Sequence, residues 1–505
     1  MQNSGKEFEI KLLFPKEKLP SINQFIIDRG GLKRQHLQAS YIDTQDFLLA
    51  NSGVALRLRK EGRKWIQTLK APTLNSLERL EHNIEIQDSS KGVPPWSLYH
   101  HGEHPAGKAL IKLLSKLPHD SLSIRYSTDI WRRKALIKTR TGQIEYSLDV
   151  GLIKAINSNG QETTLSIQEL EIELIQGHHD DVLNHAKNFI KRYKAIIDTR
   201  SKSELGYLLA NELQATPPTK SKITQLNNQK SDTEIIQSLV NSCLAQILPN
   251  LSVLNNETSE YEEYLHQLRI GLRRLKTALK YIALKKVYIS ESGMNALSSL
   301  FQKLGEYRDN EYLKEKLNPS LKASQGPQVN LLNQNQLPHP KNLISNLEFQ
   351  LLMVELISLG HKERIDPKEE ISNLSDPISL KKATTKLMDR KNISIKDDVQ
   401  NFHLLSEENI HKLRKKMKFL RYSLEFFNAY CNPKRYTEYF KSINLALNYL
   451  GNYNDISVAI EKIAPKIYEN PQMWFALGWL RSEQTQTKKL ALKSLKQFTQ
   501  LKKIW

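Results

Sequence analysis

Charged residues recur at every second position in several short segments of the N-terminal half. Because side chains alternate between the two faces of a β-strand, each set would lie on one face. Carboxylates gathered on such a face can hold Mg²⁺ or Mn²⁺, and arginine and lysine can hold phosphate oxygens. The sets are Glu7, Glu9 and Lys11; Arg57 and Arg59; Arg79 and Glu81; Arg132 and Lys134; Glu145 and Asp149; and Glu169, Glu171 and Glu173.

The residues between these charges are apolar, as at Phe8, Ile10, Leu58 and Leu170. For any one strand, the simpler interpretation is that the charges face water and the apolar residues form the core. Taken together, however, the sets include both acid-rich and base-rich strands, which favours a closed barrel with a charged interior. Enclosing charge is costly unless it serves a ligand. The pattern therefore predicts a site for a phosphorylated ligand and a divalent cation.

Three helical stretches, near residues 22–29, 107–116 and 180–193, interrupt the predicted strands. The segment QATPPTKSKITQLNNQKSD is rich in proline and polar residues and reads as a linker. Beyond it, apolar residues recur at spacings of three and four, which is typical of helices. We therefore expect a β-rich domain at 1–213, a linker at 214–232 and a helical domain at 233–505, with two repeats at about 233–317 and 378–505.

The chain is strongly basic. Its 505 residues include 74 Lys and Arg against 54 Asp and Glu, and the net charge is +20. The part after residue 214 carries +14 of this charge, which favours a polyanionic partner. Two cysteines exclude a disulfide scaffold and a four-cysteine zinc site. With no signal-peptide pattern at the N-terminus and no apolar run of membrane-spanning length, we expect a soluble cytoplasmic protein without a membrane partner.

The ordered motifs of the first half resemble the CYTH superfamily, the triphosphate tunnel metalloenzymes. The segment EFEIK at 7–11 is similar to the E-x-E-x-K signature of that family, and YIDT at 41–44 precedes the paired arginines as it does there. The resemblance covers roughly residues 1–210. It implies an α+β chain that begins with an eight-stranded antiparallel β tunnel, which binds a linear triphosphate together with Mg²⁺ or Mn²⁺.

The same resemblance implies roles for individual residues. We expect Lys70 and Glu81 to act in catalysis, while the general base stays open among a metal-activated water, a lysine such as Lys70, and a carboxylate. Two positions depart from the family pattern, because Asn83 replaces a frequent carboxylate and Ala135 a frequent aromatic residue. The implied metal ligands are Glu7, Glu9, Asp149, Glu169 and Glu171, with Glu173 ranked below them. The implied phosphate-binding residues are Lys11, Arg57, Arg59, Lys70, Arg79, Arg132, Lys134 and Lys202.

The helical half contains an internal duplication. The segment HQLRIGLRRLK from His266 is echoed by HKLRKKMKFLR from His411, and LGEYRDNEYL from Leu304 by LGNYNDISVA from Leu450. Each histidine segment forms a basic helical stripe, which is costly unless an anion neutralises it, although a solvated surface is the simpler interpretation. The pattern resembles the CHAD domain, a module of two related helical bundles that binds inorganic polyphosphate. The implied polyphosphate-binding residues are His266, Arg269, Arg273, Arg274, Lys276, His411, Arg414, Lys415, Lys418 and Arg421.

Together the two resemblances predict a metal-dependent inorganic triphosphatase with an attached polyphosphate-binding domain. The alternatives are a nucleoside or thiamine triphosphatase that uses the same site, and a polyphosphate-binding protein without catalysis. Specific nucleic-acid binding is not expected, because no helix-turn-helix, RNA-recognition or zinc motif is present. Aromatic residues also do not alternate with the basic stripes as base stacking would require.

Overall fold

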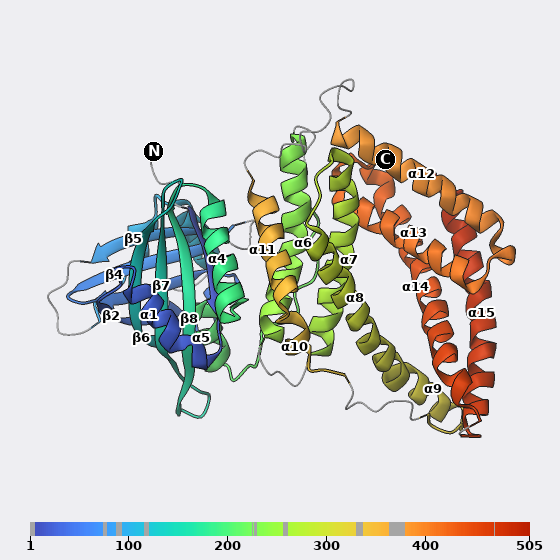
Figure 1. Cartoon of the computed structure of the whole chain (residues 1–505), viewed down its shortest axis with the longest axis horizontal. Coiled ribbons are helices and arrows are strands. Elements are labelled where there is room, and N and C mark those ends of the chain that lie inside the picture. Colours follow the sequence, from blue (N-terminus) through green and yellow to red (C-terminus); the bar gives the residue numbers. More distant parts are fainter. Residues whose placement is uncertain are drawn as a thin grey trace. The chain divides into compact units, whose positions relative to one another are not determined.

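The structure of the chain is a computed structural model (Figure 1). It describes residues 6–73, 78–86, 93–115, 121–224, 226, 230–255, 261–329, 337–362, 379–468 and 470–505. The predicted start of the second helical repeat at 378 and part of the predicted linker (225 and 227–229) lie outside the described residues.

The N-terminal part is a closed antiparallel barrel. Its strands follow the order β5-β4-β3-β2-β6-β7-β8-β1, and pairing of β5 with β1 closes the sheet. The short strand β9 (Ile196–Ile197) adds to β1 at the edge. The predicted eight-stranded antiparallel tunnel is thereby confirmed. The barrel strands are β1 (Lys6–Leu13), β2 (Arg34–Asp43), β3 (Ala55–Glu61), β4 (Lys64–Pro72), β5 (Glu78–Ile86), β6 (Ser123–Lys138), β7 (Gln143–Ile156) and β8 (Glu162–Gln176).

Helices cover the outer, apolar face of the barrel. Leu56, Leu58 and Leu69 of β3 and β4 pack with Ala106 and Leu110 of a helix in one buried cluster. Since the apolar residues face outward under helices, the charged residues that alternate with them face the barrel interior. The alternative that the charges face solvent is therefore wrong for these strands. The helices of this part are α1 (Leu19–Ile27), α2 (Leu48–Asn51), α3 (Pro105–Leu114), α4 (His179–Tyr193) and α5 (Lys202–Ala210).

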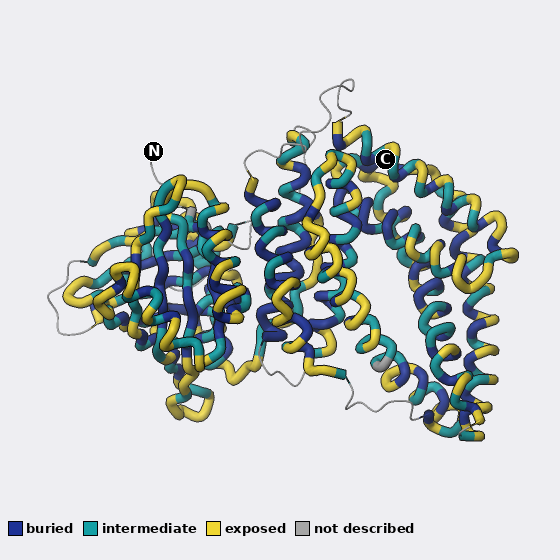
Figure 2. The backbone as a smooth tube through the Cα atoms, in the orientation of Figure 1, coloured by how far each residue is buried: buried dark blue, intermediate teal, exposed yellow. Residues whose placement is uncertain are grey.

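The described residues after α5 are mostly helical, and the helices bury part of their surface (Figure 2). Local sequence explains several helix starts. Ser379 accepts a hydrogen bond from Lys382 N, Ser406 from Asn409 N, and Asn432 caps a helix that begins with Pro433. The helices are α6 (Asp232–Leu254), α7 (Glu262–Ile282), α8 (Glu291–Tyr312), α9 (Asn318–Ala323), α10 (Pro340–Ile344), α11 (Leu347–His361), α12 (Leu380–Gln400), α13 (Glu407–Phe426), α14 (Pro433–Ile463) and α15 (Met473–Gln500).

The chain forms two compact units. Unit 1 comprises residues 1–220, 244–268 and 340–361, and unit 2 comprises 221–243, 269–339 and 362–505. The division cuts through α6 and α7, so it does not test the domain boundaries predicted from the sequence. No described helix is both long and apolar enough to cross a lipid bilayer.

Within unit 1, helical residues hold the segment that follows α4. Gln350 Oε1 accepts a hydrogen bond of 2.9 Å from Ile197 N, and Asn255 Nδ2 donates one of 3.0 Å to Ile197 O. Ser252 Oγ accepts one of 2.9 Å from Thr199 N. These bonds position the strand end that leads directly into Arg200 and Lys202, at the start of α5.

Candidate functional site

The barrel encloses a cavity of about 370 Å³ whose walls are charged. Every strand that carries an alternating charged set contributes to it except β7, whose Asp149 lies just behind the wall and is fully buried. Of the residues predicted for the tunnel, those that line the cavity are Glu7, Glu9, Lys11, Arg57, Arg59, Lys70, Arg79, Glu81, Arg132, Lys134, Glu171, Glu173 and Lys202.

Strand register pairs acids with bases across the barrel wall. Lys11 of β1 lies opposite Glu171 of β8, Lys70 of β4 opposite Glu81 of β5, and Arg132 of β6 opposite Asp149 of β7. Directly opposed side chains of neighbouring strands are close enough to form ion pairs. In the closed barrel, acidic and basic side chains of neighbouring strands therefore neutralise much of each other's charge.

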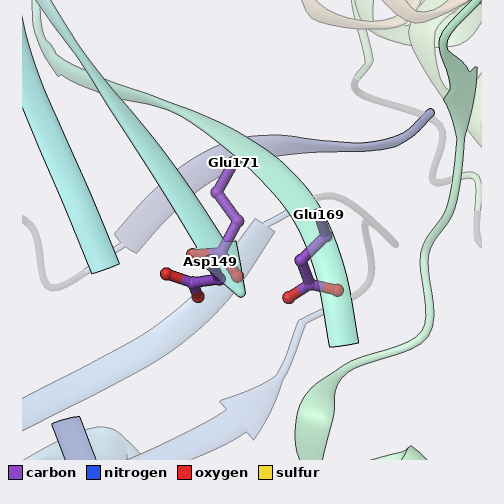
Figure 3. Close-up of side chains that lie close together, drawn as sticks. All are labelled: Asp149, Glu169 and Glu171. Atoms are coloured by element: carbon purple, nitrogen blue, oxygen red, sulfur yellow. The ribbon is translucent and has the colours of Figure 1, made fainter. Parts of the chain in front are cut away.

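Asp149, Glu169 and Glu171 form a carboxylate triad between β7 and β8. One oxygen from each lies within 4.8 Å of the others, and the side chains converge (Figure 3). Lys202 of α5 contacts all three, at 2.7 Å from both Asp149 and Glu171. Arg132 adds hydrogen bonds of 2.6 and 2.5 Å to Asp149 and one of 2.5 Å to Glu171.

The charges around the triad act on its members differently. Burial raises the pKa of Glu169. Burial has the same effect on Asp149, but Arg132 and Lys202 outweigh it and lower the pKa of that carboxyl. Lys202 and Arg132 likewise hold the pKa of Glu171 well below its usual value. The triad is thus ionised at least in part, and its donors are oxygens of the kind that Mg²⁺ and Mn²⁺ prefer.

Lys70 links two carboxyl groups at another part of the wall. Its Nζ lies 2.6 Å from Glu7 and 2.8 Å from Glu81. Burial disfavours a charged Lys70, yet Glu7 and Glu81 outweigh burial and raise its pKa. Burial, helped by Glu9 and Glu81, raises the pKa of Glu7 to about 9. The raised pKa favours the ammonium form of Lys70 in this arrangement.

Two arginines of β3 have hydrogen-bonding capacity left over. The Nε atoms of Arg57 and Arg59 are buried and have no hydrogen-bond partner among the described residues. Burial and the neighbouring Arg57 lower the pKa of Arg59 to about 10. Buried donors without acceptors are costly, and a phosphate oxyanion would satisfy them.

Tyr41 is a cavity residue that the sequence motifs indicated only as part of the YIDT segment. It lines the cavity beside Arg57 and stacks on Tyr126 at a ring distance of 4.9 Å. Tyr126 in turn shares a hydrogen bond of 2.7 Å with Ser203, the neighbour of Lys202. This chain of contacts connects the arginine wall to the start of α5.

Glu173 has a larger place in the site than the sequence suggested. It lies opposite Glu9 on β1 and lines the cavity. Burial, together with Glu9 and Glu145, raises its pKa to about 7. A carboxyl group with this pKa exchanges protons readily at neutral pH. The period-two pattern already placed Glu173 on the same strand face as Glu169 and Glu171. Only the strand register shows that it lies beside two other acids, Glu9 and Glu145.

The two departures from the family motif have simple local explanations. Asn83 Nδ2 donates a hydrogen bond of 2.9 Å to Glu81 and Asn83 Oδ1 accepts one of 2.7 Å from Thr68. Asn83 therefore orients Glu81 without adding charge. Ala135 is buried on the opposite face of β6 from Arg132 and Lys134 and does not line the cavity.

Unit 2 contains a basic cluster, which we define as Arg269, Arg273, Arg308, Arg414 and Lys418. Burial and the surrounding cations lower the pKa values of Arg269 and Arg414 to about 10 and that of Lys418 well below its usual value. The Nε atoms of Arg269 and Arg414 are buried without a hydrogen-bond partner among the described residues. Such a cluster favours an anionic ligand.

The cluster has matching parts from the two sequence copies. Gly305 of α8 lies against Arg269 of α7, and Gly451 of α14 lies against Arg414 of α13. A Cβ added to Gly305 would lie 3.6 Å from Nη2 of Arg269, and one added to Gly451 would lie 3.7 Å from Nη2 of Arg414. Both distances are ordinary van der Waals contacts. Arg308, from α8, pairs with Asp455 at 3.0 Å.

The other residues predicted to bind polyphosphate lie differently. Arg274 is fully buried and Arg421 is partly buried, and both pair with Glu425, at 3.5 and 3.2 Å. The single carboxylate of Glu425 therefore compensates part of the charge of these two arginines. His411 hydrogen-bonds Asn454, and Lys276 lies 4.5 Å from the ring centre of Phe301. Lys415 is exposed on α13, and His266 lies one turn before Arg269 on α7.

Comparison with known proteins identifies both parts of the chain. Residues 5–207 match the family model of the CYTH domain, and residues 238–464 match that of the CHAD domain. An inorganic triphosphatase of Haemophilus influenzae is 26% identical over 212 residues, which cover 41% of this chain. The match spans 56% of that relative, so this chain matches about half of the length of the Haemophilus protein.

Solved structures with similarity to this chain include a CHAD domain of the plant Ricinus communis. It is 22% identical with a TM-score of 0.47, and the match covers 58% of this chain and 99% of that one. A proposed adenylyl cyclase of Hippeastrum with a dominant triphosphatase activity is 18% identical with a TM-score of 0.28, covering 40% of this chain and 95% of that one. TM-scores this low carry no argument of their own, and the two domains are identified by the family models.

Proposed function

Because the chain contains a CYTH domain followed by a CHAD domain, we propose that it hydrolyses inorganic triphosphate to diphosphate and phosphate inside the barrel, with a divalent metal ion. The observation that carries the proposal is the enclosed cavity in which unpartnered arginine donors face a carboxylate-rich wall. The similarity to an inorganic triphosphatase supports the same reaction class.

Phosphoryl transfer requires positioning and charge neutralisation more than covalent chemistry. In this proposal Arg57 and Arg59 bind phosphate oxygens through their unpartnered donors, and the remaining cavity cations hold the chain of phosphates extended. Lys11, Lys70, Arg79, Arg132, Lys134 and Lys202 complete this set. Protonated Lys70 stabilises negative charge on the phosphate, while ionised Glu81 keeps Lys70 and Arg57 in place.

The proposed metal ligands are Glu7, Glu9, Asp149, Glu169 and Glu171, and their oxygens suit Mg²⁺ or Mn²⁺. Glu7, whose pKa is about 9, would release its proton when the ion binds. The triad fits such an ion, because its oxygens already converge on a cation, the Lys202 ammonium. When bound, the metal would neutralise charge on the phosphate oxygens and activate the attacking water. Glu173, with a pKa of about 7, is the carboxylate that we propose to accept the proton of that water.

For the CHAD domain, we propose binding of inorganic polyphosphate at the basic cluster. Buried guanidinium donors without acceptors among the described residues and a half-buried lysine with a strongly lowered pKa support this assignment. A polyphosphate chain would supply the missing negative charge along the helices. The domain would thereby hold polyphosphate on the same chain as the triphosphatase.

The first experiment measures phosphate release from tripolyphosphate, ATP and thiamine triphosphate, each with Mg²⁺, Mn²⁺ or EDTA. The proposal expects metal-dependent release that is fastest from tripolyphosphate. Faster release from ATP or thiamine triphosphate would instead identify the nucleoside or thiamine triphosphatase. No release from any substrate, with polyphosphate still bound, would identify a binding protein.

The variant Glu9→Gln separates catalysis from binding. We expect hydrolysis to fall at least a hundredfold with polyphosphate affinity unchanged, because Glu9 lies in the barrel and not in the basic cluster. Glu85→Gln is the matched control. Glu85 is a barrel residue whose side chain is exposed and forms an ion pair with Lys64. A full rate in Glu9→Gln would refute the role of Glu9 as a metal ligand.

A further inference from the structure

Unit 1 contains a second cavity, outside the charged tunnel, of about 830 Å³. We call it the side cavity. It lies where the end of β1, the start of β8 and the end of α4 meet the segment that leads to α5. A cavity of this volume is large enough for a small organic molecule.

The walls of the side cavity are mainly apolar. Phe14, Ile167 and Ile190 are buried there, while Leu165 and Leu347 keep 37% and 40% of their surface exposed. Exposed aliphatic surface of this kind gains roughly 25 cal/mol for each Å² that a ligand covers. The side cavity therefore differs from the tunnel, whose lining is mostly charged, and it does not suit an inorganic phosphate alone.

The charge of the side cavity is positive. Its two acidic lining residues are already compensated, because Asp198 pairs with Arg200 and Glu169 pairs with Lys202 and Lys11. Four lysines also line the cavity: Lys16, Lys191 and Lys194 are exposed, and Lys341 is half-buried. The uncompensated charge beside the apolar walls is thus cationic.

We propose that the side cavity binds a small amphipathic anion, with its apolar body against the apolar walls and its carboxylate or phosphate group among the three exposed lysines. The side cavity shares Glu169 of the triad with the tunnel wall but is a different cavity, and binding there does not depend on the proposed hydrolysis. An alkyl chain with an anionic head and a nucleotide share this chemistry. The two sources differ in the apolar body, which is aliphatic in the first and a planar base in the second.

The test measures binding by calorimetry, using the full chain and decyl phosphate below its micelle concentration. Saturating tripolyphosphate and EDTA are present throughout, so that the tunnel is occupied and no hydrolysis occurs. We expect saturable binding with one site per chain. Decanol, which lacks the charge, and inorganic phosphate, which lacks the chain, should each bind at least tenfold more weakly. AMP serves as the nucleotide probe, and tighter binding of AMP than of decyl phosphate would identify the nucleotide as the source.

Two sets of variants test the location. The triple variant Lys16→Gln, Lys191→Gln, Lys194→Gln should weaken decyl phosphate binding at least tenfold and leave decanol binding unchanged. The matched control replaces three exposed barrel lysines that do not line the cavity, Lys33, Lys108 and Lys138, with Gln and should bind as the wild type does. Leu165→Gln, at a partly exposed position, should weaken decyl phosphate and decanol alike.

Circular dichroism and the thermal midpoint confirm that each variant is folded. The proposal is overturned if neither decyl phosphate nor AMP binds saturably, if the control triple variant weakens binding as much as the cavity variant, or if inorganic phosphate binds as tightly as decyl phosphate. Because none of these measurements depends on turnover, such a result would leave the proposed triphosphatase activity standing.

Discussion

The Nζ atom of Lys202 lies 2.7 Å from Oδ2 of Asp149 and is the cation on which the carboxylate triad converges. Lys202 begins α5, whereas Asp149 lies in the middle of β7, so the contact joins a helix start to the barrel wall. Removing one partner of a buried ion pair leaves an uncompensated charge, which is strongly destabilising. The contact therefore has consequences for both stability and metal binding.

Lys202→Met should lower the free energy of unfolding by about 3 kcal/mol in EDTA, because three buried carboxylates lose their shared cation. Mn²⁺ should then raise the thermal midpoint of the variant more than that of the wild type, since a divalent ion can take over the compensation. Scanning calorimetry with and without Mn²⁺ measures both effects. Lys412→Met, which removes an exposed helix pair with Glu408, is the control. A variant midpoint that does not respond to Mn²⁺ would argue against a metal site at the triad.

Glu173 predicts a pH dependence of hydrolysis. Its pKa of about 7 means that the carboxyl is protonated below pH 7 and ionised above it. Since only the ionised form accepts a proton, kcat/KM should fall about tenfold per pH unit below pH 7 in the wild type. Glu173→Gln should have a much lower rate and lack this decline. Glu162→Gln, an exposed position on the same strand, should keep the wild-type profile, and the same profile in Glu173→Gln would exclude Glu173 as the base.

Arg57 should contribute through the geometry of its guanidinium group as well as through its charge. Its buried Nε lacks a partner among the described residues, and lysine cannot replace the planar fork that binds two phosphate oxygens. We expect Arg57→Lys to raise KM for tripolyphosphate at least tenfold. Arg63→Lys, in the exposed turn between β3 and β4, should change nothing. Steady-state kinetics with saturating metal provides the measurement, and an unchanged KM in Arg57→Lys would contradict the assignment.

Lys418 should cost stability in the absence of ligand and support binding in its presence. Burial and the neighbouring arginines of the basic cluster lower its pKa, so the folded state disfavours its charge. Lys418→Met should therefore raise the thermal midpoint of the free protein and weaken polyphosphate binding severalfold. Lys441→Met, at an exposed position on α14, should affect neither quantity. A lower midpoint in Lys418→Met, or unchanged polyphosphate affinity, would count against the role of the cluster.

Much of the fold could be predicted from local patterns. Charge at every second residue and the apolar residues between them predicted the strands, and helical spacing predicted α7 and α13. The ordered motifs then pointed to the closed eight-stranded tunnel that the structure contains. The helical stretches near 22–29, 107–116 and 180–193 correspond to α1, α3 and α4.

The sequence by itself determined which residues share a strand face, because a period of two follows from backbone geometry alone. Only the tertiary structure decided which charges meet across strands. Register and barrel closure place Glu173 beside Glu9, and the position of α5 brings Lys202 to the triad. Helix packing brings Arg274 of α7 to Glu425 of α13. Ion pairs and pKa values depend on distances between residues far apart in the chain, and those distances exist only once the barrel closes and the helices pack.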